Sequence, residues 1–371
     1  MINDLIQAVL PSIYPMLKAN YGLTFTQVGL ITLVFQLTAS LLQPWVGYHT
    51  DRHPKPWLLP AGSLCTLAGI LLLAFVGSFP AILLASALVG IGSSTFHPEA
   101  SRIARLASGG RYGLAQSTFQ VGGNAGSAFG PLLAAAIVIP YGQGHVAWFG
   151  LFAVLSILVL YGLSRWYRNH LTLFKLKQGA QATHGLSKRR VRAALLVLAL
   201  LVFSKYFYMS GFTSFFTFYL IEKFDVSIAN SQLYLFLFLG AVAAGTFFGG
   251  PIGDRIGRKA VIWFSILGVA PFTLALPHVD LFWTSVLSMI IGFILASAFS
   301  AIVVFAQELM PGNVGMIAGL FFGLMFGIGG IGGAFLGYLA DIHGIEYVFF
   351  LCSFLPLLGV LTVLLPSTRP R

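Results

Sequence analysis

The chain has 371 residues, of which 57% are hydrophobic and only 8% are charged, and its formal net charge is +11 at pH 7. Soluble domains carry about 25% charged residues, so this composition excludes a soluble globular protein. Residues 56–98, 112–164 and 309–340 contain no Asp, Glu, Lys or Arg. A helix crosses a bilayer with about 20 apolar residues, so the longer stretches each predict two membrane helices joined by a tight turn. Their continuous apolarity differs from the alternating pattern of barrel strands.

The positions of the turns between apolar stretches predict an all-α membrane protein with twelve transmembrane helices. In chain order these are residues 1–18, 28–48, 57–77, 81–100, 114–139, 147–165, 193–221, 231–252, 260–277, 282–307, 316–341 and 347–365. The long polar segment at residues 166–192 is predicted to be a basic linker between a six-helix first half, 1–165, and a six-helix second half, 193–371.

The first predicted helix is short. Residues 1–18 give about 27 Å of helix, so we expect Asp4 at the exposed end of this span and a native start upstream of Met1.

The distribution of cations predicts the orientation in the membrane. Of the 21 Lys and Arg residues, only Lys18, Lys205 and Lys223 fall outside the loops and termini on one side. Cytoplasmic loops retain Lys and Arg, so both termini and the linker are predicted to be cytoplasmic in a multi-pass protein. This topology accounts for the positive charge, and no nucleic-acid partner is expected.

A short charged motif occurs twice. Residues 249–259 read "GGPIGDRIGRK" and residues 47–56 read "GYHTDRHPKP". In this frame Gly47 matches Gly250, Asp51 matches Asp254, and Arg52 matches Arg255, whereas Pro54 and Pro56 replace Gly257 and Lys259. Each copy is predicted to lie in the loop between the second and third helix of its half. A charged loop that only sets topology would explain one copy, but two equivalent copies favour a device that opens and closes the cytoplasmic mouth.

Further charges are predicted at the same level. His97, Glu99 and Arg102 close the fourth helix, and Glu308 closes the tenth. We expect them to form charge clusters with the motif cations that hold the mouth shut. The candidate gate residues are Gly47, Asp51, Arg52, Glu99, Arg102, Gly250, Asp254, Arg255, Gly257, Arg258, Lys259 and Glu308.

The repeated Gly-x-x-x-Asp-Arg motif resembles the loop signature of the major facilitator superfamily. Residues 92–135, with "FSKYFYM" at 203–209, "ILGVAPFTLALP" at 266–277 and "GFILASAFSAIVVFAQELMPG" at 292–312, closely resemble the fosmidomycin-resistance exporters of bacterial inner membranes. This resemblance covers nearly the whole chain. It implies a fold of two pseudo-symmetric six-helix halves and proton-coupled efflux of a small phosphonate antibiotic by alternating access. The "GGNAGSAFGP" run at 122–131 resembles the superfamily's antiporter motif only loosely.

The resemblance also implies that the first helix of each half faces a central cavity. Asp4 and Lys205 belong to these helices, and ionisable groups inside a membrane are costly enough to suggest function. We expect Asp4 to couple protons and Lys205 to bind the anion. The substrate-binding candidates are Lys205, Tyr208, Gln36, Gln120, Asn124 and His97. For Gln36, Gln120 and Asn124, interhelical hydrogen bonding is the alternative explanation. For Lys205 the alternative is a structural pairing with a distant carboxylate, for Asp4 a charge at the cytoplasmic end, and for Tyr208 contact with lipid.

Other functions remain open at this stage. Within transport, a proton symporter importing an organic anion is the alternative; outside it, a non-transporting receptor or scaffold on the same fold. His97 and Glu99 could form a catalytic pair, but no nucleophile motif or metal-ligand spacing accompanies them. We therefore expect no enzyme activity, no metal, no cofactor and a monomer in the bilayer.

Overall fold

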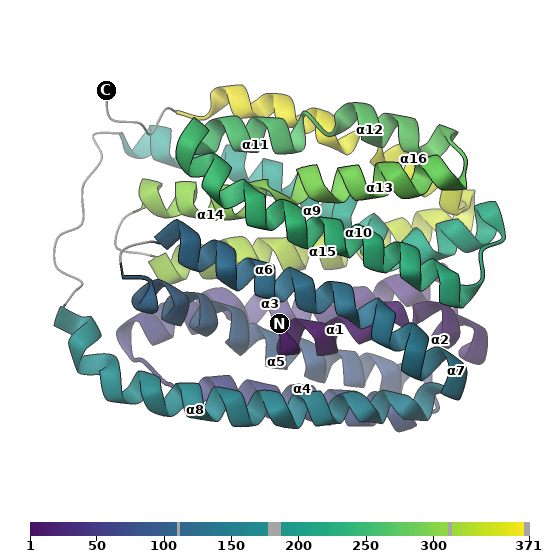
Figure 1. Cartoon of the computed structure of the whole chain (residues 1–371), viewed down its shortest axis with the longest axis horizontal. Coiled ribbons are helices and arrows are strands. Elements are labelled where there is room, and N and C mark those ends of the chain that lie inside the picture. Colours follow the sequence, from purple (N-terminus) through teal and green to yellow (C-terminus); the bar gives the residue numbers. More distant parts are fainter. Residues whose placement is uncertain (110–111, 177–186, 311–313, 367–371) are drawn as a thin grey trace.

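A computed structural model describes residues 1–109, 112–176, 187–310 and 314–366, and these residues form a bundle of helices without strands (Figure 1). Among them, eleven helices are long and apolar enough to cross a membrane. The segment Ile2–Tyr21, ahead of these eleven, forms two shorter helices where the first span is predicted. The prediction of an all-helical, twelve-span protein is confirmed.

The first six spans are built by the elements up to the linker. They are α1 (Ile2–Ser12) with α2 (Tyr14–Tyr21), α3 (Phe25–Arg52), α4 (Leu58–Phe75), α5 (Phe79–Ala107), α6 (Tyr112–Leu133) with η1 (Ala134–Val138) and α7 (Ile139–Tyr141), and η2 (Gln143–Trp148) with α8 (Phe149–Leu176). Much of the predicted linker is therefore helical, because α8 continues to Leu176; residues 177–186 lie outside the described residues.

The last six spans begin after the linker. They are α9 (Lys188–Phe224), α10 (Ile228–Ile256), α11 (Arg258–Ile266) with α12 (Ala270–Ala275) and η3 (Leu276–His278), α13 (Leu281–Ala296) with α14 (Ala298–Leu309), α15 (Val314–His343), and α16 (Ile345–Cys352) with η4 (Leu355–Leu364). The two sets of six lie side by side as a lower and an upper group in Figure 1.

Two helices extend further than predicted and carry the charged motifs with them. α3 continues to Arg52 and α10 to Ile256, so the Asp-Arg pair of each copy lies on the last turn of a helix and not in a loop. The helices stop where the backbone requires it. Pro54 disfavours helical geometry in the residue before it, and Gly257 has a positive φ of 98° that suits glycine. We call the end of the bundle where α3 and α10 finish the motif end, and the other the far end.

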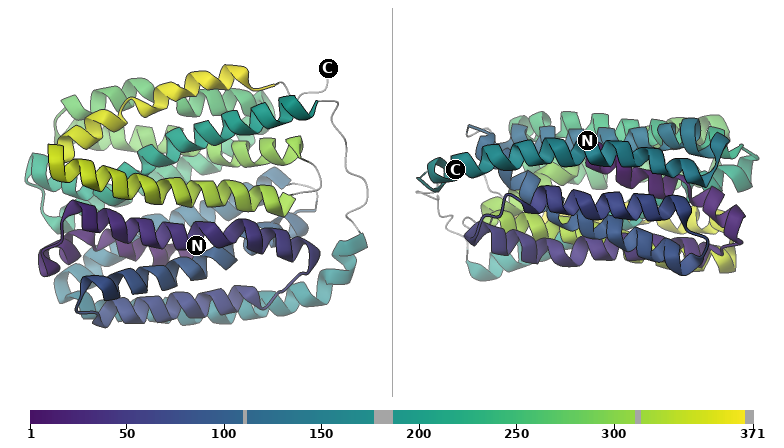
Figure 2. Two further views of the ribbon diagram at one scale, coloured as in Figure 1. Left: turned by 180° about the vertical axis from the view of Figure 1, so that it is seen from behind. Right: turned by 90° about the horizontal axis from the view of Figure 1, so that it is seen from below.

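The two halves meet along a seam between α3 and α15, which lie side by side in both views of Figure 2 and are in extensive contact. Glycines make the helices approach backbone to backbone. A Cβ added at Gly29 would lie 2.4 Å from the carbonyl oxygen of Gly333, and one added at Gly337 would lie 2.5 Å from that of Phe25. The seam therefore has little room for side chains.

At the far end, a carboxylate of the second half binds the start of α3. Asp341 accepts hydrogen bonds from the backbone N–H groups of Phe25, at 2.9 Å, and Thr26, at 2.8 Å, and from the Thr26 hydroxyl. The free N–H groups of a first helical turn favour such an anion. Asp341 thus ties α15 to α3 across the seam.

The first span places Asp4 differently from the prediction. The span breaks at Ile13, between Pro11 and Pro15, and it begins inside the bundle, where the N-terminus lies in Figure 1. The Asp4 side chain is only 15% exposed. The expectation that Asp4 lies at the exposed end is wrong, because α2 turns into α3 at the far end and the rest of this span fills only part of the bundle's length.

Candidate functional site

A cavity of about 230 Å³ lies between the two halves. The first half lines it with residues of α1, α3, α5 and α6, and the second half with residues of α9, α10, α14 and α15. Its polar lining includes Asp4, Gln7, Gln36, His97, Gln120, Asn124, Lys205, Ser210, Thr213 and Thr246. The predicted residues Asp4, Gln36, His97, Gln120, Asn124 and Lys205 are therefore brought together at one cavity.

Tyr208 is not among the residues that line this cavity. Its ring packs 5.3 Å from that of Phe212, which stacks on Phe238 at 4.4 Å within the second half. At about 100° per residue, Lys205 lies at one edge of the sector of α9 that faces the cavity, and Tyr208 lies beyond that edge. Tyr206, on the other side of Lys205, lines the cavity instead.

Lys205 is buried and faces aromatic rings. Its ammonium nitrogen lies 5.2 Å from the ring centre of Tyr206 and 5.5 Å from that of Phe299, within cation–π range. In the described part of the chain, no carboxylate lies within 4 Å of this nitrogen. Asp4 and Lys205 face the same cavity without forming an ion pair.

Asp4 instead lies beside a histidine. Its Oδ1 atom is 3.7 Å from Nε2 of His97, and its Oδ2 atom is 3.7 Å from the N-terminal ammonium group. A separation of 3.7 Å allows attraction between charges but is too long for a hydrogen bond. Neither ring nitrogen of the buried His97 has a hydrogen-bond partner among the described residues.

Aromatic side chains of the other half cover the imidazole. The His97 ring stacks on Phe322 at 5.6 Å and lies 5.2 Å from Phe326, and both belong to α15. Phe322 contacts Phe299 at 5.3 Å, and Phe299 contacts Lys205. A continuous set of contacts therefore joins Asp4 and His97 to Lys205 through two phenylalanine rings.

A hydrogen bond between the halves borders the cavity. The Asn124 side-chain amide on α6 donates to the Thr246 hydroxyl on α10 at 2.6 Å. On the seam, Gln36 of α3 lies against α15, because a Cβ added at Gly329 would lie 2.2 Å from its Oε1 atom. Both residues contact the opposite half as well as the cavity.

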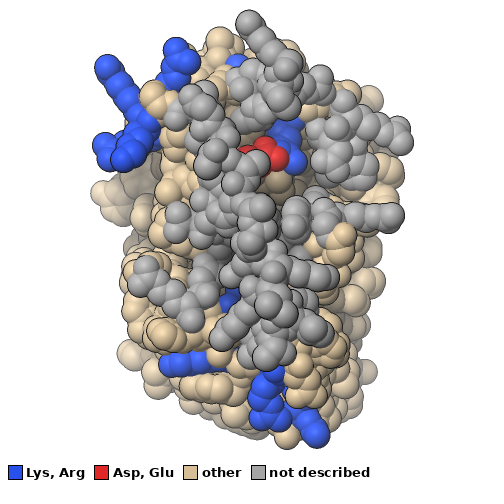
Figure 3. All heavy atoms as spheres, turned by 90° about the vertical axis from the view of Figure 1, so that its left-hand side faces the viewer, with Lys and Arg blue, Asp and Glu red and all other residues tan. Residues whose placement is uncertain are grey.

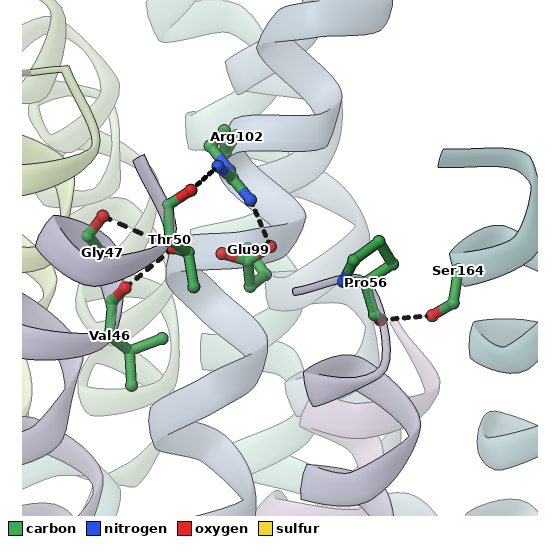
Figure 4. A network of polar contacts seen from close by, with 7 residues as sticks. All are labelled: Val46, Gly47, Thr50, Pro56, Glu99, Arg102 and Ser164. Carbon is green, nitrogen blue, oxygen red and sulfur yellow. Dashed lines mark hydrogen bonds and ion pairs between the residues drawn. The ribbon is translucent and has the colours of Figure 1, made fainter. Parts of the chain in front are cut away.

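At the motif end, the first half is braced internally (Figure 4). Arg102 forms an ion pair with Glu99 at 2.7 Å and also donates to the backbone carbonyl of Thr50, one residue before the motif's Asp-Arg pair. The carbonyl of Pro56 accepts a hydrogen bond from the Ser164 hydroxyl at 2.6 Å. Gly47 lies one turn before Thr50, whose hydroxyl donates to the Gly47 carbonyl at 3.4 Å.

The second half repeats this bracing with different chemistry. Arg258 forms an ion pair with Glu308, and Lys259 donates to the carbonyls of Val363, at 3.0 Å, and Leu365. Lys259 matches Pro56 of the first copy, so the loop of each half is tied to the sixth span of that half. These described contacts stay within one half. The side chains of Asp51, Arg52, Asp254 and Arg255, and the surroundings of Gly250, lie outside the described residues.

Several residues that line the cavity cannot be identified from the sequence. Phe299, Phe322 and Phe326 lie in apolar stretches where a phenylalanine facing lipid looks the same as one facing a cavity. Tyr206 differs from Tyr208 only in its direction around the helix. Only the fold shows which of these aromatic side chains contact His97 and Lys205.

Comparison with known proteins agrees with this architecture. The chain matches the sequence profile of the Major Facilitator Superfamily over residues 1–334 and 198–371. It is 61% identical over 371 residues to the fosmidomycin resistance protein of Escherichia coli (strain K12), covering 100% of this chain and 91% of the relative. It is also 43% identical over 372 residues to the uncharacterized MFS-type transporter YfnC of Bacillus subtilis (strain 168), with coverage of 100% and 91%.

A solved structure shares the fold. The human organic anion transporter MFSD10 (TETRAN) superposes with a TM-score of 0.73 at 18% identity, covering 98% of this chain and 97% of that chain. At this identity the likeness concerns the fold alone. Together with the profile match and the two full-length relatives, it shows that the chain belongs to the major facilitator superfamily.

Proposed function

We propose that the protein exports a small phosphonate antibiotic across a bacterial inner membrane in exchange for protons. The observation that carries the proposal is one cavity, enclosed by both halves, that holds a buried lysine without a carboxylate within 4 Å among the described residues and, separately, a carboxylate beside a histidine. The high identity to a protein named for fosmidomycin resistance supports the substrate class.

Lys205 is the proposed anion site. A buried ammonium group without a counter-charge is unfavourable in a membrane, and a phosphonate that approaches it supplies the missing charge. The cation–π contacts with Tyr206 and Phe299 hold the group in place without neutralising it. Gln36, Gln120 and Asn124 supply neutral hydrogen-bonding groups around the same cavity. The reaction proposed is movement of the substrate, so no bond is formed or broken and no cofactor is needed.

The halves are the proposed moving bodies. The Lys and Arg side chains visible at the motif end in Figure 3 support a cytoplasmic position for that end and a periplasmic position for the far end. The motif contacts then keep the cytoplasmic ends of residues 1–165 and 193–371 rigid while the halves rock about the cavity. A monomer contains both halves and is sufficient for this cycle.

Asp4 is the proposed proton carrier. Asp4→Asn removes the titratable group but keeps its shape and hydrogen-bonding capacity. We expect this variant to bind fosmidomycin while losing the pH dependence of binding. Equilibrium binding to purified protein across a pH series is the measurement, and unchanged pH dependence would assign the proton to another group.

Reconstituted vesicles test the function directly. With a pH gradient imposed across proteoliposomes, adding fosmidomycin should move protons and fosmidomycin in opposite directions. Empty vesicles, and vesicles containing Lys205→Met, are the controls. Movement of both in the same direction would identify a symporter, and binding without any movement would identify a receptor on the same fold.

A further inference from the structure

We propose that His97 is a second proton carrier of the exchange, paired with Asp4, and that its charge is sensed by the other half of the protein through Phe322 and Phe326. The inference rests on the proposed function. It differs from the sequence-based expectation, in which His97 contributes to substrate binding or to the charge clusters that hold the mouth shut.

The imidazole of His97 has unmet polarity. His97 is 5% exposed, and neither of its ring nitrogens has a hydrogen-bond partner among the described residues. Leaving a polar group buried without a partner is costly, so such groups deserve a functional explanation. A proton on Nε2 converts the 3.7 Å contact with Asp4 into an attraction between opposite charges. A positive charge on the imidazole and a negative charge on Asp4 therefore favour each other.

Among the described residues, few charged groups surround Asp4 and His97. The charged groups that face the pair are the N-terminal ammonium beside Asp4 on α1, and Lys205 across the cavity on α9. Glu99, two residues along α5, is occupied by Arg102. α6 and α15 face the imidazole with Phe119, Phe322 and Phe326, which carry no charge. Asp4 is thus the carboxylate positioned to hold a proton on His97.

The charge of the imidazole changes how strongly the two halves attract each other. A positively charged imidazole is attracted to the faces of aromatic rings, whereas a neutral one is attracted less. Phe322 and Phe326 belong to α15 of the second half, and His97 belongs to α5 of the first. Binding a proton therefore strengthens the contact between the halves, and releasing it weakens that contact. In each cycle, a ring nitrogen of His97 takes up one proton from one side of the membrane and releases it to the opposite side.

The ring contacts also connect the proton site to the substrate site. Phe322 touches Phe299, which in turn lies under the Lys205 ammonium. An anion that draws Lys205 away from Phe299 leaves that ring free to shift against Phe322. The same two phenylalanine rings then respond to the substrate on one side and to the proton on the other.

The test compares three variants with the wild type, in detergent and in proteoliposomes, with fosmidomycin as the probe. His97→Gln keeps a neutral polar side chain of similar length; it should still bind fosmidomycin but should lose the part of the pH dependence of the affinity that His97 contributes. It should also release fewer protons per bound molecule. Phe326→Leu should release as many protons per bound molecule as the wild type but exchange more slowly. His343→Gln, at the exposed end of α15, is the matched control and should behave as the wild type.

The outcomes separate the two proposals. If the wild type moves no protons with fosmidomycin, the proposed function itself fails. If the wild type does so and His97→Gln releases as many protons with the same pH profile, the His97 inference is overturned. Should His97→Gln fail to fold, ¹⁵N resonances of the histidines in intact wild-type protein decide: one must titrate, and its titration must change in Asp4→Asn. A wild-type spectrum without such a resonance refutes the inference.

Discussion

At the scale of single residues, Lys205 shows how burial creates a demand for a ligand. Its ammonium group is enclosed by the cavity and by two aromatic rings, and the nearest described acidic group of the cavity, Asp4, is occupied by His97 and the N-terminal ammonium. A lysine on a soluble surface would satisfy this charge with water. Inside a membrane protein, an anionic ligand is the natural partner.

Lys205→Met should therefore weaken the binding of fosmidomycin. Hydrogen bonds to charged groups contribute about 1.5 to 3 kcal/mol, which corresponds to an increase in Kd of about 10- to 100-fold. Isothermal titration calorimetry with purified protein measures this Kd. Lys223→Met is the matched control, because Lys223 lies at the far end beside Glu346, and it should leave the Kd unchanged. An unaltered Kd in Lys205→Met would place the anion site elsewhere.

The residue types in this chain indicate which side chains line the cavity, but the sequence does not show in which direction each of them points. Asp4, His97 and Lys205 stand out in sequence because charges and imidazoles are rare inside membranes. The sequence does not predict that Asp4 contacts His97 and not Lys205, because that pairing depends on how α1 lies between α5 and α9. Tyr206 and Tyr208 are equally plausible in sequence, and only the orientation of α9 separates them.

At the scale of helices, the far end is held by one carboxylate that crosses between the halves. Asp341→Asn removes the negative charge and part of the bonding to the first turn of α3. We expect the cavity to open more often toward the far end, because a loss of about 1 to 2 kcal/mol changes a population ratio about 5- to 30-fold.

Cysteine labelling measures this change. A reporter, Thr213→Cys, lines the cavity in a protein whose native Cys65 and Cys352 are replaced by Ala. A membrane-impermeant thiol reagent applied at the far end should react several-fold faster when Asp341→Asn is present. Glu346→Gln is the matched control, because it removes a carboxylate whose described contact, Lys223, lies in the same half. Equal rates in all variants would exclude Asp341 as a contact that limits opening.

The glycine seam between α3 and α15 makes a second prediction about helices. An added methyl group at Gly29 would lie 2.4 Å from the Gly333 carbonyl oxygen, so Gly29→Ala must push the halves apart, at a cost of about 1 to 3 kcal/mol. Thermal unfolding in detergent should show a lower Tm and vesicle assays a lower transport rate. Gly240→Ala, where no atom lies within 4 Å of the new methyl group, is the control. A Tm equal to that of the control would contradict the close packing.

Helix number was predictable in this chain, and helix ends were less so. Long apolar stretches predict crossings, because twenty apolar residues have few alternatives to a membrane helix. The ends of α3 and α10 lie beyond the apolar stretches, since the hydrogen-bonded backbone continues through Asp-Arg until a proline or a left-handed glycine stops it. The charged residues of the motif therefore predicted a loop, whereas in the structure they lie on the last turn of a helix.

At the scale of the whole molecule, the two copies of the sequence motif make equivalent contacts in the two halves. Pro56 and Lys259 match in sequence, and both tie the end of the second span to the sixth span of their own half. The sequence predicts that the copies are equivalent, since the frame of glycine, aspartate and arginine is shared. Pro56 has no polar side chain, so the sequence does not predict that its backbone carbonyl makes the contact that the Lys259 ammonium group makes in the second copy.

The size of the central cavity has a consequence for the cell that carries the protein. Pockets for drug-sized molecules usually measure about 300 to 1,000 Å³, whereas this one measures about 230 Å³ and contains a buried cation. Bacteria that express the protein should survive raised doses of fosmidomycin but remain as sensitive as before to bulky, positively charged dyes. Growth inhibition across a panel of compounds that differ in size and charge measures this resistance spectrum. Its narrowness would distinguish a specialised defence from a general one, and broad protection against large cations would show that the cavity does not set the spectrum.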